Sequence, residues 1–487
     1  MWQKQESDAI APGRNPMSTA AVAAVDLGAT SGRVMVGHVG PDTLEATAVA
    51  RFPNEPVQTS DGLHWNILGL YGAAVNGLRE AFRAEPAIRS IGVDSWAVDY
   101  GLLRAGRLLG NPFHYRDSRT ERGVEIVHGR MPHADLYARN GLQFLPFNTV
   151  YQFAAEPRDV LDFADSALLI PDLFGFWLTG QARAEQTNAS TTGLLRAGGG
   201  WDEELIATLG LPRGILPSLI QPGERLGALL PGVGTSIGAG PDVAVTAVGS
   251  HDTASAVVAV PMRPDAAAYI SCGTWGLVGV EVERPVLTPE ALAANFTNEG
   301  GVDGRIRLLH NIMGLWVLSE AVRTWERAGH PIDLPTLLDS AEEVTSEVPV
   351  VDINDPRFLP PGDMPSRIDG WCAEHGIAPP RTRAEYARSI VESLAQAFAE
   401  AAHEAGRIGG VDVRMIHIVG GGSLNELLCQ RTADRSGLPV LAGPVEATAL
   451  GNVLIQARAL GSVTGSLEAL RDLVARTHAP RRYEPRA

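Results

Sequence analysis

Short apolar runs followed by glycine and small polar residues recur along the chain and predict β-strands. These runs occupy residues 21–26, 33–39, 90–94, 243–249 and 413–419. Between them, apolar residues fall mostly at helical spacing. Strands that alternate with helices over such a length are typical of an α/β fold.

Two of the helical segments are defined clearly by their apolar spacing. Residues 382–406 carry apolar side chains at helical intervals, and Thr382 with Glu385 forms a capping-box pattern at the start. Residues 314–328 show a similar stripe that contains two tryptophans, and we assign this stripe to the core. Both helices are therefore predicted to be architectural.

Other segments lack such periodicity. Residues 223–240 and 354–365 are rich in glycine and proline, which predicts loops. Residues 1–19 are polar and contain no apolar signal core, so we expect a disordered leader, with Met17 as an alternative start.

The strands predicted at 21–26 and 33–39 are joined by a tight loop of Gly, Thr and Ser that suits a phosphate group. Small residues allow backbone N–H groups to point into one concavity. Asp26 closes the first strand and is placed to hold a metal ion through its water shell. Taken alone, the segment is more typical of an ordinary surface turn.

Residues 268–280 repeat this order of strand, Gly/Thr loop and returning strand about half a chain later. Two such loops would hold the phosphate chain of a nucleotide from both sides of a cleft. A third glycine site, at 420–422, follows the strand at 413–419. Glycines there would let an adenine or a ribose lie against the backbone.

Asp252 follows the predicted strand at 243–249 and is the candidate general base. A carboxylate at a strand end, flanked by small polar residues, can accept the proton of a substrate hydroxyl during phosphoryl transfer. A helix cap formed by Asp252 or Ser250 accounts for the same residues. His251 is interpreted as a second base, or as a residue whose hydrogen bond stabilises the local structure or orients the substrate.

The segment after the strand at 90–94 mixes acids with an aromatic residue. Carboxylates such as Asp94 and Asp99 accept hydrogen bonds from sugar hydroxyls, and an indole such as Trp96 covers the apolar face of a sugar. A buried Trp96 with solvated acids would explain the segment as well.

Composition narrows the classes of function. With 487 residues, 45% of them hydrophobic, the chain is long enough for two domains that each have a core. The net charge of −16 argues against a nucleic-acid surface. Because no apolar run approaches the ~20 residues that span a bilayer, we expect no membrane segment and a cytoplasmic location.

Lysine and cysteine usage excludes several chemistries. Lys4 is the only lysine, so phosphate sites and covalent sites that depend on lysine are ruled out. The three cysteines, Cys272, Cys372 and Cys429, have no metal-ligand spacing and indicate a reduced compartment. Cys272 is interpreted as a small buried residue rather than a nucleophile.

These segments occur in the order found in the FGGY sugar kinases, which the chain resembles over nearly its whole length from about residue 20. Within that family it most resembles the rhamnulokinases. The resemblance is carried by the segments AVDLGATSGRVMV, DSWAVDYGLL, GLQFLPFNTVYQ, GSHDTASAV, NIMGLW and GPVEATALGN.

The resemblance implies an α/β fold of two actin-like, ribonuclease H-like ATPase domains hinged around a central ATP and sugar cleft. Residues 20–255 would form the N-terminal domain, with the sugar site and the first phosphate hairpin. Residues 256–487 would form the C-terminal domain, with the second hairpin and the adenosine site. The implied reaction transfers a phosphoryl group from MgATP to the 1-hydroxyl of L-rhamnulose, in the degradation of L-rhamnose.

Matching motif positions imply a role for individual residues, with Asp252 as the catalytic base and Asp26 near the magnesium ion through water. The implied sugar contacts are Ala97, His251, Asp252, Thr253 and Asn311. The implied ATP contacts are Ala29, Thr30, Ser31, Gly32, Arg33, Thr274, Ser319 and Gly421.

Ala97 and Ser319 depart from the pattern of similar kinases, which tend to have Gly and Gln there. The extra methyl group of Ala97 would crowd the sugar, and one methyl in a pocket is worth ~1–3 kcal/mol of discrimination. The shorter Ser319 would lose one nucleotide contact. Related ketoses such as L-fuculose and L-xylulose therefore stay open as substrates.

Two other classes of protein use the same fold. An actin-like ATPase or acetate-type kinase is disfavoured by the sugar motifs. A non-catalytic sugar sensor is disfavoured by Asp252, by the phosphate hairpin and by the lack of a basic helix-turn-helix pattern. The expected partners are a small sugar and ATP, without nucleic acid or membrane, and both a monomer and a homodimer are compatible with the sequence.

Overall fold

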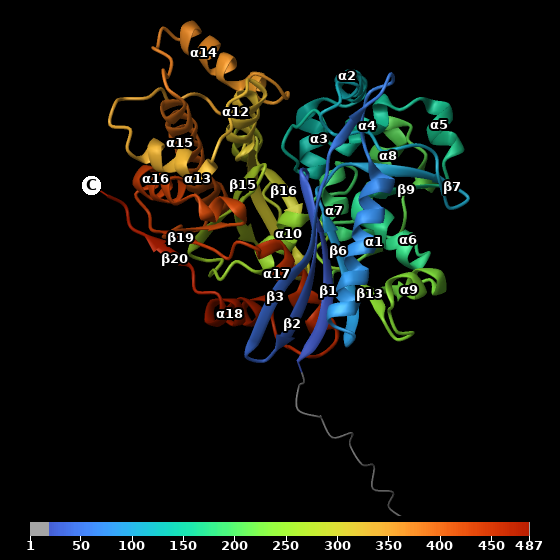
Figure 1. Ribbon diagram of the computed structural model, residues 1–487. Coiled ribbons are helices and arrows are strands. Elements are labelled where there is room, and N and C mark those ends of the chain that lie inside the picture. The colour runs from blue at the N-terminus through green and yellow to red at the C-terminus, as the bar shows by residue number, and fades with distance from the viewer. Residues whose placement is uncertain (1–18, 487) are drawn as a thin grey trace, which may run out of the picture.

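A computed structural model describes residues 19–486, and the leader expected at 1–19 lies outside these residues apart from Thr19. The described chain forms two lobes, each built on one mixed β-sheet (Figure 1). We call the first sheet with α1 to α9 the N-terminal lobe, and the second sheet with α11 to α16 and α18 the C-terminal lobe. Two further helices, α10 and α17, lie between them.

The first sheet has the strand order β12-β13-β6-β1-β2-β3. The strands β1, β2 and β3 are antiparallel neighbours, whereas β6 is parallel to β1 and β13 is parallel to β6. The bounds are β1 (Ala20–Leu27), β2 (Ser31–Gly40), β3 (Thr43–Pro53), β6 (Ile88–Ser95), β12 (Arg225–Ala228) and β13 (Ala244–Thr246).

The second sheet repeats this plan in the order β16-β17-β15-β14-β18-β19-β20. The strands β17, β15 and β14 are antiparallel, and β18 and β19 continue in parallel. This shared plan explains why the two hairpins look alike in sequence. The bounds are β14 (Ala267–Cys272), β15 (Gly276–Val282), β16 (Thr297–Gly300), β17 (Ile306–Ile312), β18 (Met415–Val419), β19 (Val440–Ala442) and β20 (Arg481–Tyr483).

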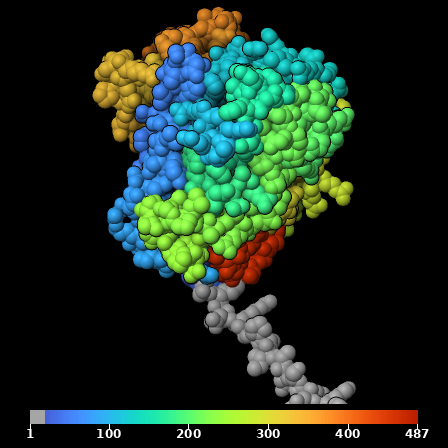
Figure 2. All heavy atoms as spheres, turned by 90° about the vertical axis from the view of Figure 1, so that its right-hand side faces the viewer, coloured from blue at the N-terminus to red at the C-terminus, as the bar shows by residue number. Residues whose placement is uncertain are grey.

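Of the helices of the N-terminal lobe, α1 and α6 pack against its sheet and α2, α4 and α8 form a separate core; the lobe makes up much of the outer face seen in Figure 2. The helices of this lobe are α1 (Ile67–Ala84), α2 (Thr120–Arg130), α3 (His133–Asn140), α4 (Thr149–Ala155), α5 (Arg158–Phe163), α6 (Ile170–Thr179), α7 (Gln186–Ala189), α8 (Glu203–Leu209) and α9 (Pro231–Ile237). Short strands complete this lobe: β4 (Pro56–Gln58), β5 (Leu63–Trp65), β7 (Tyr100–Arg104), β8 (Arg107–Leu108), β9 (Ser166–Leu169), β10 (Ala184–Glu185) and β11 (Leu219–Ile220).

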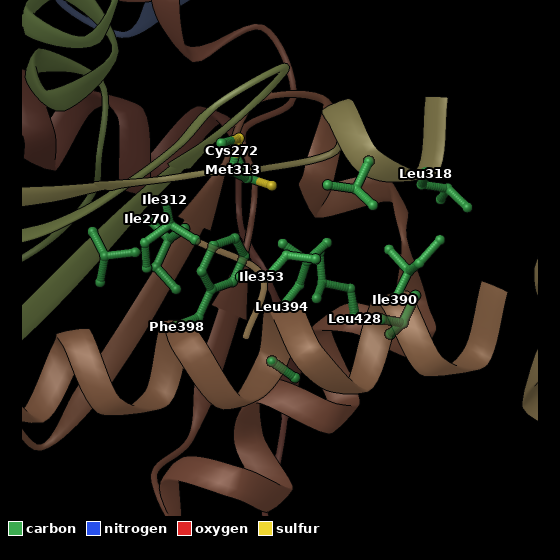
Figure 3. Close-up of a cluster of buried hydrophobic side chains, with 14 of the residues drawn as sticks. Ile270, Cys272, Ile312, Met313, Leu318, Ile353, Ile390, Leu394, Phe398 and Leu428 are labelled. Atoms are coloured by element: carbon green, nitrogen blue, oxygen red, sulfur yellow. The ribbon is translucent and has the colours of Figure 1, made fainter. Parts of the chain in front are cut away.

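The C-terminal lobe is organised around its longest helix, α15, whose apolar face packs against the second sheet. Phe398 of α15 lies beside Ile270 and Ile312 of the strands, and Leu394 and Ile390 continue the same core toward Leu428 (Figure 3). The remaining helices are α11 (Pro289–Ala293), α12 (Trp316–Arg327), α13 (Leu334–Glu342), α14 (Met364–Glu374), α15 (Arg383–Gly409), α16 (Glu426–Ser436) and α18 (Leu467–Thr477).

Most of the predicted elements are confirmed. All five predicted strands are present, although the one expected at 243–249 is limited to Ala244–Thr246. The helix predicted at 382–406 is α15, and Thr382 with Glu385 forms the expected capping box. The helix predicted at 314–328 is α12.

The loop predicted at 223–240 is wrong, because this segment contains β12 and α9. Its prolines and glycines mark the ends of a helix rather than a loop: Pro231 occupies the first turn of α9, and Gly238 ends it in the left-handed conformation. The segment 354–365 is mainly loop as predicted, with a short 3₁₀ turn at Pro356–Phe358, and α14 begins at Met364.

The helices α10 (Asp252–Val258) and α17 (Ala447–Ala459) share one apolar core with strands of both sheets. They approach each other at Gly451, where an added Cβ would lie 1.8 Å from the carbonyl oxygen of Ser255. Only glycine permits this contact. The boundary predicted after residue 255 falls inside α10.

No described helix combines the length and apolar character that crossing a membrane requires.

The substitution Gly451→Ala should destabilise the protein by about 1–3 kcal/mol, because the new methyl group overpacks the contact between α10 and α17. Thermal unfolding should show a midpoint several degrees lower than that of the wild type. Gly72→Ala in α1 is the matched control, since nothing lies within 4 Å of a Cβ at that position. Alanine is favoured there by about 1 kcal/mol, so the control midpoint should hold or rise. Equal midpoints for the two variants would contradict the close contact.

Candidate active site

A cleft of about 310 Å³ is lined by residues of both lobes. It contains most of the residues singled out from the sequence. Those that line it are Asp26, Ala29, Thr30, Ser31, Arg33, Ala97, His251, Asp252, Thr253, Thr274, Asn311 and Gly421.

Two predicted nucleotide contacts, Gly32 and Ser319, are not among the lining residues. A Cβ on Gly32 would lie 2.2 Å from the ring of Phe52, so packing of β2 against β3 accounts for this glycine. Ser319 is exposed on α12. Gly32 therefore lies between two cleft residues, Ser31 and Arg33, without lining the cleft itself, and Ser319 is also not among the lining residues.

Each lobe contributes one tight hairpin loop to the cleft. In the first, the Gly28 N–H donates to the Ser31 carbonyl at 2.9 Å, and the Asn54 amide donates to the Gly28 carbonyl at 2.9 Å. In the second, the Gly273 N–H donates to the Trp275 carbonyl at 2.8 Å. Internal hydrogen bonds thus fix the shape of both loops before any ligand binds.

Asp26 lies at the end of β1 beside Asp94 on the neighbouring strand β6. Arg33 donates from Nε to Asp26 at 2.7 Å and also pairs with Glu446. Burial raises the pKa of Asp26, although Arg33 opposes the shift. Burial and the nearby Asp26 raise the pKa of Asp94 still further, and Asn452 donates a hydrogen bond to it. The two carboxyl groups therefore resist being ionised together.

The described residues contain no group of three or more His, Cys, Asp or Glu side chains arranged to hold a metal ion. Asp26 is nevertheless a carboxylate at the edge of the cleft. Mg²⁺ characteristically keeps several waters and binds through one or two carboxylates together with substrate phosphates. This donor set fits such an ion, provided that water and phosphate supply most of its ligands.

Asp252 is the first residue of α10, and the N-cap position is occupied by His251, whose side chain makes no capping hydrogen bond. About 34% of the Asp252 side chain is exposed, and it lines the cleft. Thr253 donates to its Oδ1 at 3.0 Å. The helix-cap interpretation of Asp252 is therefore wrong, and the carboxylate is open to a substrate.

Glu185 anchors the turn that carries Asp252. Its Oε2 accepts from the Ser250 backbone N–H at 3.0 Å and from the Ser250 hydroxyl at 2.8 Å, which also shows that Ser250 is not a helix cap. Thr187 donates to the same oxygen at 2.6 Å. Sequence reasoning missed Glu185, because it lies 65 residues before Ser250 and no local pattern links the two.

The sugar-binding interpretation of Asp94 and Asp99 is wrong, because both acids are buried and bound by protein donors. Asp99 accepts from the indole nitrogens of Trp65 at 2.6 Å and Trp96 at 3.0 Å, and from Gln152 at 2.9 Å. Burial raises the pKa of Asp99 to about 6 despite these bonds. Trp96 is buried, as the alternative expected, but the acids are not solvated.

Several contacts across the cleft were not predicted. The side-chain oxygen of Gln143 accepts from the Asn311 backbone N–H at 2.8 Å and from its amide at 2.9 Å. The indole of Trp275 donates to the Tyr115 hydroxyl at 3.3 Å. The N-terminal lobe supplies Gln143 and Tyr115, so these bonds join the two lobes. In the sequence, the motifs GLQFLPFNTVYQ and NIMGLW, which contain Gln143 and Asn311, and the hairpin at 268–280 signalled this region, but not the contacts between them.

Cys272 is buried behind the second hairpin, and burial raises the pKa of its thiol. It is thus a small core residue, as predicted.

Two lobes with one strand plan, each presenting a glycine hairpin to a shared cleft, define the class of actin-like ATPase folds. The predicted fold class is confirmed. Residues 21–259 match the N-terminal domain of the FGGY family of carbohydrate kinases, and residues 268–460 match its C-terminal domain. The chain belongs to this family and is a carbohydrate kinase.

Curated relatives cover nearly the whole chain. It is 43% identical over 478 residues to a rhamnulokinase of Pectobacterium atrosepticum. The matched region spans 97% of this chain and 94% of the relative. It is 38% identical over 467 residues to a rhamnulokinase of Bacteroides thetaiotaomicron, with 95% of each chain covered.

Solved structures share the fold at low identity. A ligand-bound xylulose kinase from Lactobacillus acidophilus matches with a TM-score of 0.77 at 18% identity, over 96% of this chain and 94% of the other. Plasmodium falciparum glycerol kinase with ADP matches with a TM-score of 0.74 at 15% identity, over 96% and 94%.

The substitution Glu185→Gln should reduce both stability and sugar-dependent ATP turnover. A glutamine offers fewer acceptor sites to the donors of Ser250 and Thr187, and a buried donor without a partner costs about 1–3 kcal/mol. Thermal unfolding and a coupled ADP assay measure the two effects. Glu204→Gln is the control, because the Glu204 side chain is 70% exposed and its ion pair with Arg139 contributes little. A Glu185→Gln variant that behaves like this control would contradict the anchoring role.

Proposed function

We propose that this carbohydrate kinase phosphorylates the 1-hydroxyl of L-rhamnulose, giving L-rhamnulose 1-phosphate and ADP in the degradation of L-rhamnose. The observation that carries the proposal is the identity of about 40% to rhamnulokinases over nearly the full chain. The open carboxylate of Asp252, in a cleft shared with both hairpins, supports a phosphoryl transfer there.

Asp252 is the proposed base. Its carboxylate would accept the proton of the 1-hydroxyl as the sugar oxygen attacks the γ-phosphorus and the bond to the β-phosphate oxygen breaks. Thr253 and His251 lie beside Oδ1, at 3.0 Å and 3.4 Å, which would leave Oδ2 for the sugar. Ala97 and Asn311 are the other proposed sugar contacts.

The proposed ATP contacts that line the cleft are Ala29, Thr30, Ser31, Arg33, Thr274 and Gly421. ATP is implied by the kinase family. We further propose Mg²⁺ as the cofactor, held by Asp26 through water. When bound, it would neutralise phosphate charge. Because Lys4 is the only lysine, backbone N–H groups and arginine must be the protein groups that stabilise the negative charge of the phosphates.

The turn that carries Ala97 is rigid, which makes this residue a determinant of the preferred ketose. The Asp99 N–H donates to the Ala97 carbonyl at 2.9 Å, and Val98 between them has a φ of 68°, a strained value for a β-branched residue. The Ala97 methyl group therefore cannot easily move away from a bound sugar. A cytoplasmic location, and a monomer or homodimer, complete the proposal.

The substitution Asp252→Asn should lower kcat at least about a hundredfold, because general-base catalysis contributes roughly 10²–10⁴-fold. The amide has a similar shape, so the Kd values of ATP and sugar should change little. Steady-state kinetics and isothermal titration calorimetry measure the two effects. The turnover of this variant decides the role: a near-normal kcat would remove Asp252 as the base.

A panel of L-rhamnulose, L-fuculose, L-xylulose and glycerol tests the acceptor directly. With MgATP present, ADP release should be fastest with L-rhamnulose, judged by kcat/KM. Ala97→Gly should change the ranking of ketoses by at most about 1–3 kcal/mol, the value of one methyl group. Preference for another ketose would make that ketose, rather than L-rhamnulose, the substrate. No turnover with any sugar would refute the proposed function.

A further inference from the structure

At the wall of the cleft, which Glu299 lines, Glu299 of β16 and Arg307 of β17 form a buried ion pair. They are direct cross-strand partners, and Arg307 Nη2 lies 3.1 Å from Glu299 Oε2. The Arg307 side chain is 0% exposed. Placing a charge pair here costs desolvation free energy that an apolar pair would not. Neither hairpin loop nor the metal position accounts for it.

The pair reaches the candidate base through one imidazole ring. His251 Nδ1 lies 3.0 Å from Arg307 Nη2 and 3.2 Å from Glu299 Oε2. On the other side of the ring, His251 Nε2 lies 3.4 Å from Asp252 Oδ1. A continuous row of polar atoms therefore runs from the second sheet to the carboxylate in the cleft.

The chemistry of these groups fixes the Nδ1 side of the imidazole. His251 Nδ1 faces both a guanidinium group, which can only donate hydrogen bonds, and a carboxylate, which can only accept them, so the pair holds this ring nitrogen in either tautomer. Burial raises the pKa of Glu299, but Arg307 and His251 outweigh this and hold it below its ordinary value. Glu299 is thus ionised and balances the charge of Arg307.

We infer that Glu299 and Arg307 are positioning residues that hold the Nδ1 side of the His251 ring, so that its Nε2 side orients Asp252 Oδ1 and leaves Oδ2 to the sugar hydroxyl. This inference rests on the proposed role of Asp252 as the base. It adds two residues of the C-terminal lobe to the reaction, both acting through His251.

The same sheet supplies a matched control. Glu281 of β15 is the cross-strand partner of Arg307 on its other side. It pairs with Arg471 of α18 through two bonds, of 2.9 Å and 3.0 Å, and both side chains are buried. Arg471 also donates to the Val257 carbonyl at 3.1 Å. The control pair therefore reports the cost of losing a buried ion pair without losing the contacts to His251 Nδ1.

The test compares the double variant Glu299→Gln with Arg307→Met against the double variant Glu281→Gln with Arg471→Met. Each removes both charges of one pair, so neither leaves an uncompensated charge. We expect the first to lower kcat at least tenfold with the KM for ATP within twofold. The control should keep kcat within twofold although its unfolding midpoint falls by a similar amount. Equal kcat values for the two variants would overturn the inference.

A second measurement separates positioning from general damage. His251→Gln keeps a side-chain amide beside Asp252 but has no Nδ1 for the ion pair to hold. Adding the Glu299→Gln and Arg307→Met changes to His251→Gln should then cost less than threefold in kcat, against at least tenfold in the wild type. A loss of full size in both backgrounds would overturn the inference.

If the double variant does not fold, Arg307→Lys serves in its place. It keeps the charge but loses the planar fork that spans His251 and Glu299. A kcat lowered with an unchanged KM for ATP supports the inference, and a normal kcat refutes it. Wild-type protein that phosphorylates no sugar of the panel would refute the proposed function itself, whereas an active wild type with fully active variants refutes only the positioning role.

Discussion

The contact between Gly451 of α17 and the Ser255 carbonyl of α10 determines how the two lobes meet. A Cβ at this position would be 1.8 Å from that oxygen, so the two helices can lie this close only because residue 451 is glycine. The helix α10 starts with Asp252, which lines the candidate active-site cleft. Thr448, in the first turn of α17, lines the same cleft. The position of the candidate base relative to both hairpins follows from this packing.

Burial divides the acids around the cleft into two groups. Glu185 and Asp99 are saturated by hydrogen bonds from the protein, and they fix the turns that carry Ser250 and Trp96. Asp252, in contrast, keeps part of its carboxylate exposed to the cleft. Asp252 is therefore available for chemistry, because protein donors do not occupy its whole carboxylate. This explains why Asp252, and not Glu185 or Asp99, fits the role of base.

Strands, hairpins and helices that depend on local sequence pattern could be predicted from the sequence. Contacts between segments that are far apart in the chain could not. The two hairpins, the five predicted strands and the capped helix α15 follow from short-range periodicity and are present. The role of Asp99 as a buried hydrogen-bond acceptor could not be predicted, because its donors Trp65 and Gln152 are 34 and 53 residues away in the sequence. The bond between Gln143 and Asn311 spans 168 residues and forms only when the lobes meet. The packing role of Gly32 likewise depends on Phe52 of the next strand.

The most direct test of the account is a crystal structure of the protein with L-rhamnulose and a non-hydrolysable ATP analogue. The account predicts the 1-hydroxyl oxygen within about 2.6–3.2 Å of an Asp252 carboxylate oxygen. It also predicts the phosphate chain between the loops at residues 28–31 and 273–275. A nucleotide bound away from both loops, or a sugar whose hydroxyls all lie beyond hydrogen-bond reach of Asp252, would contradict it.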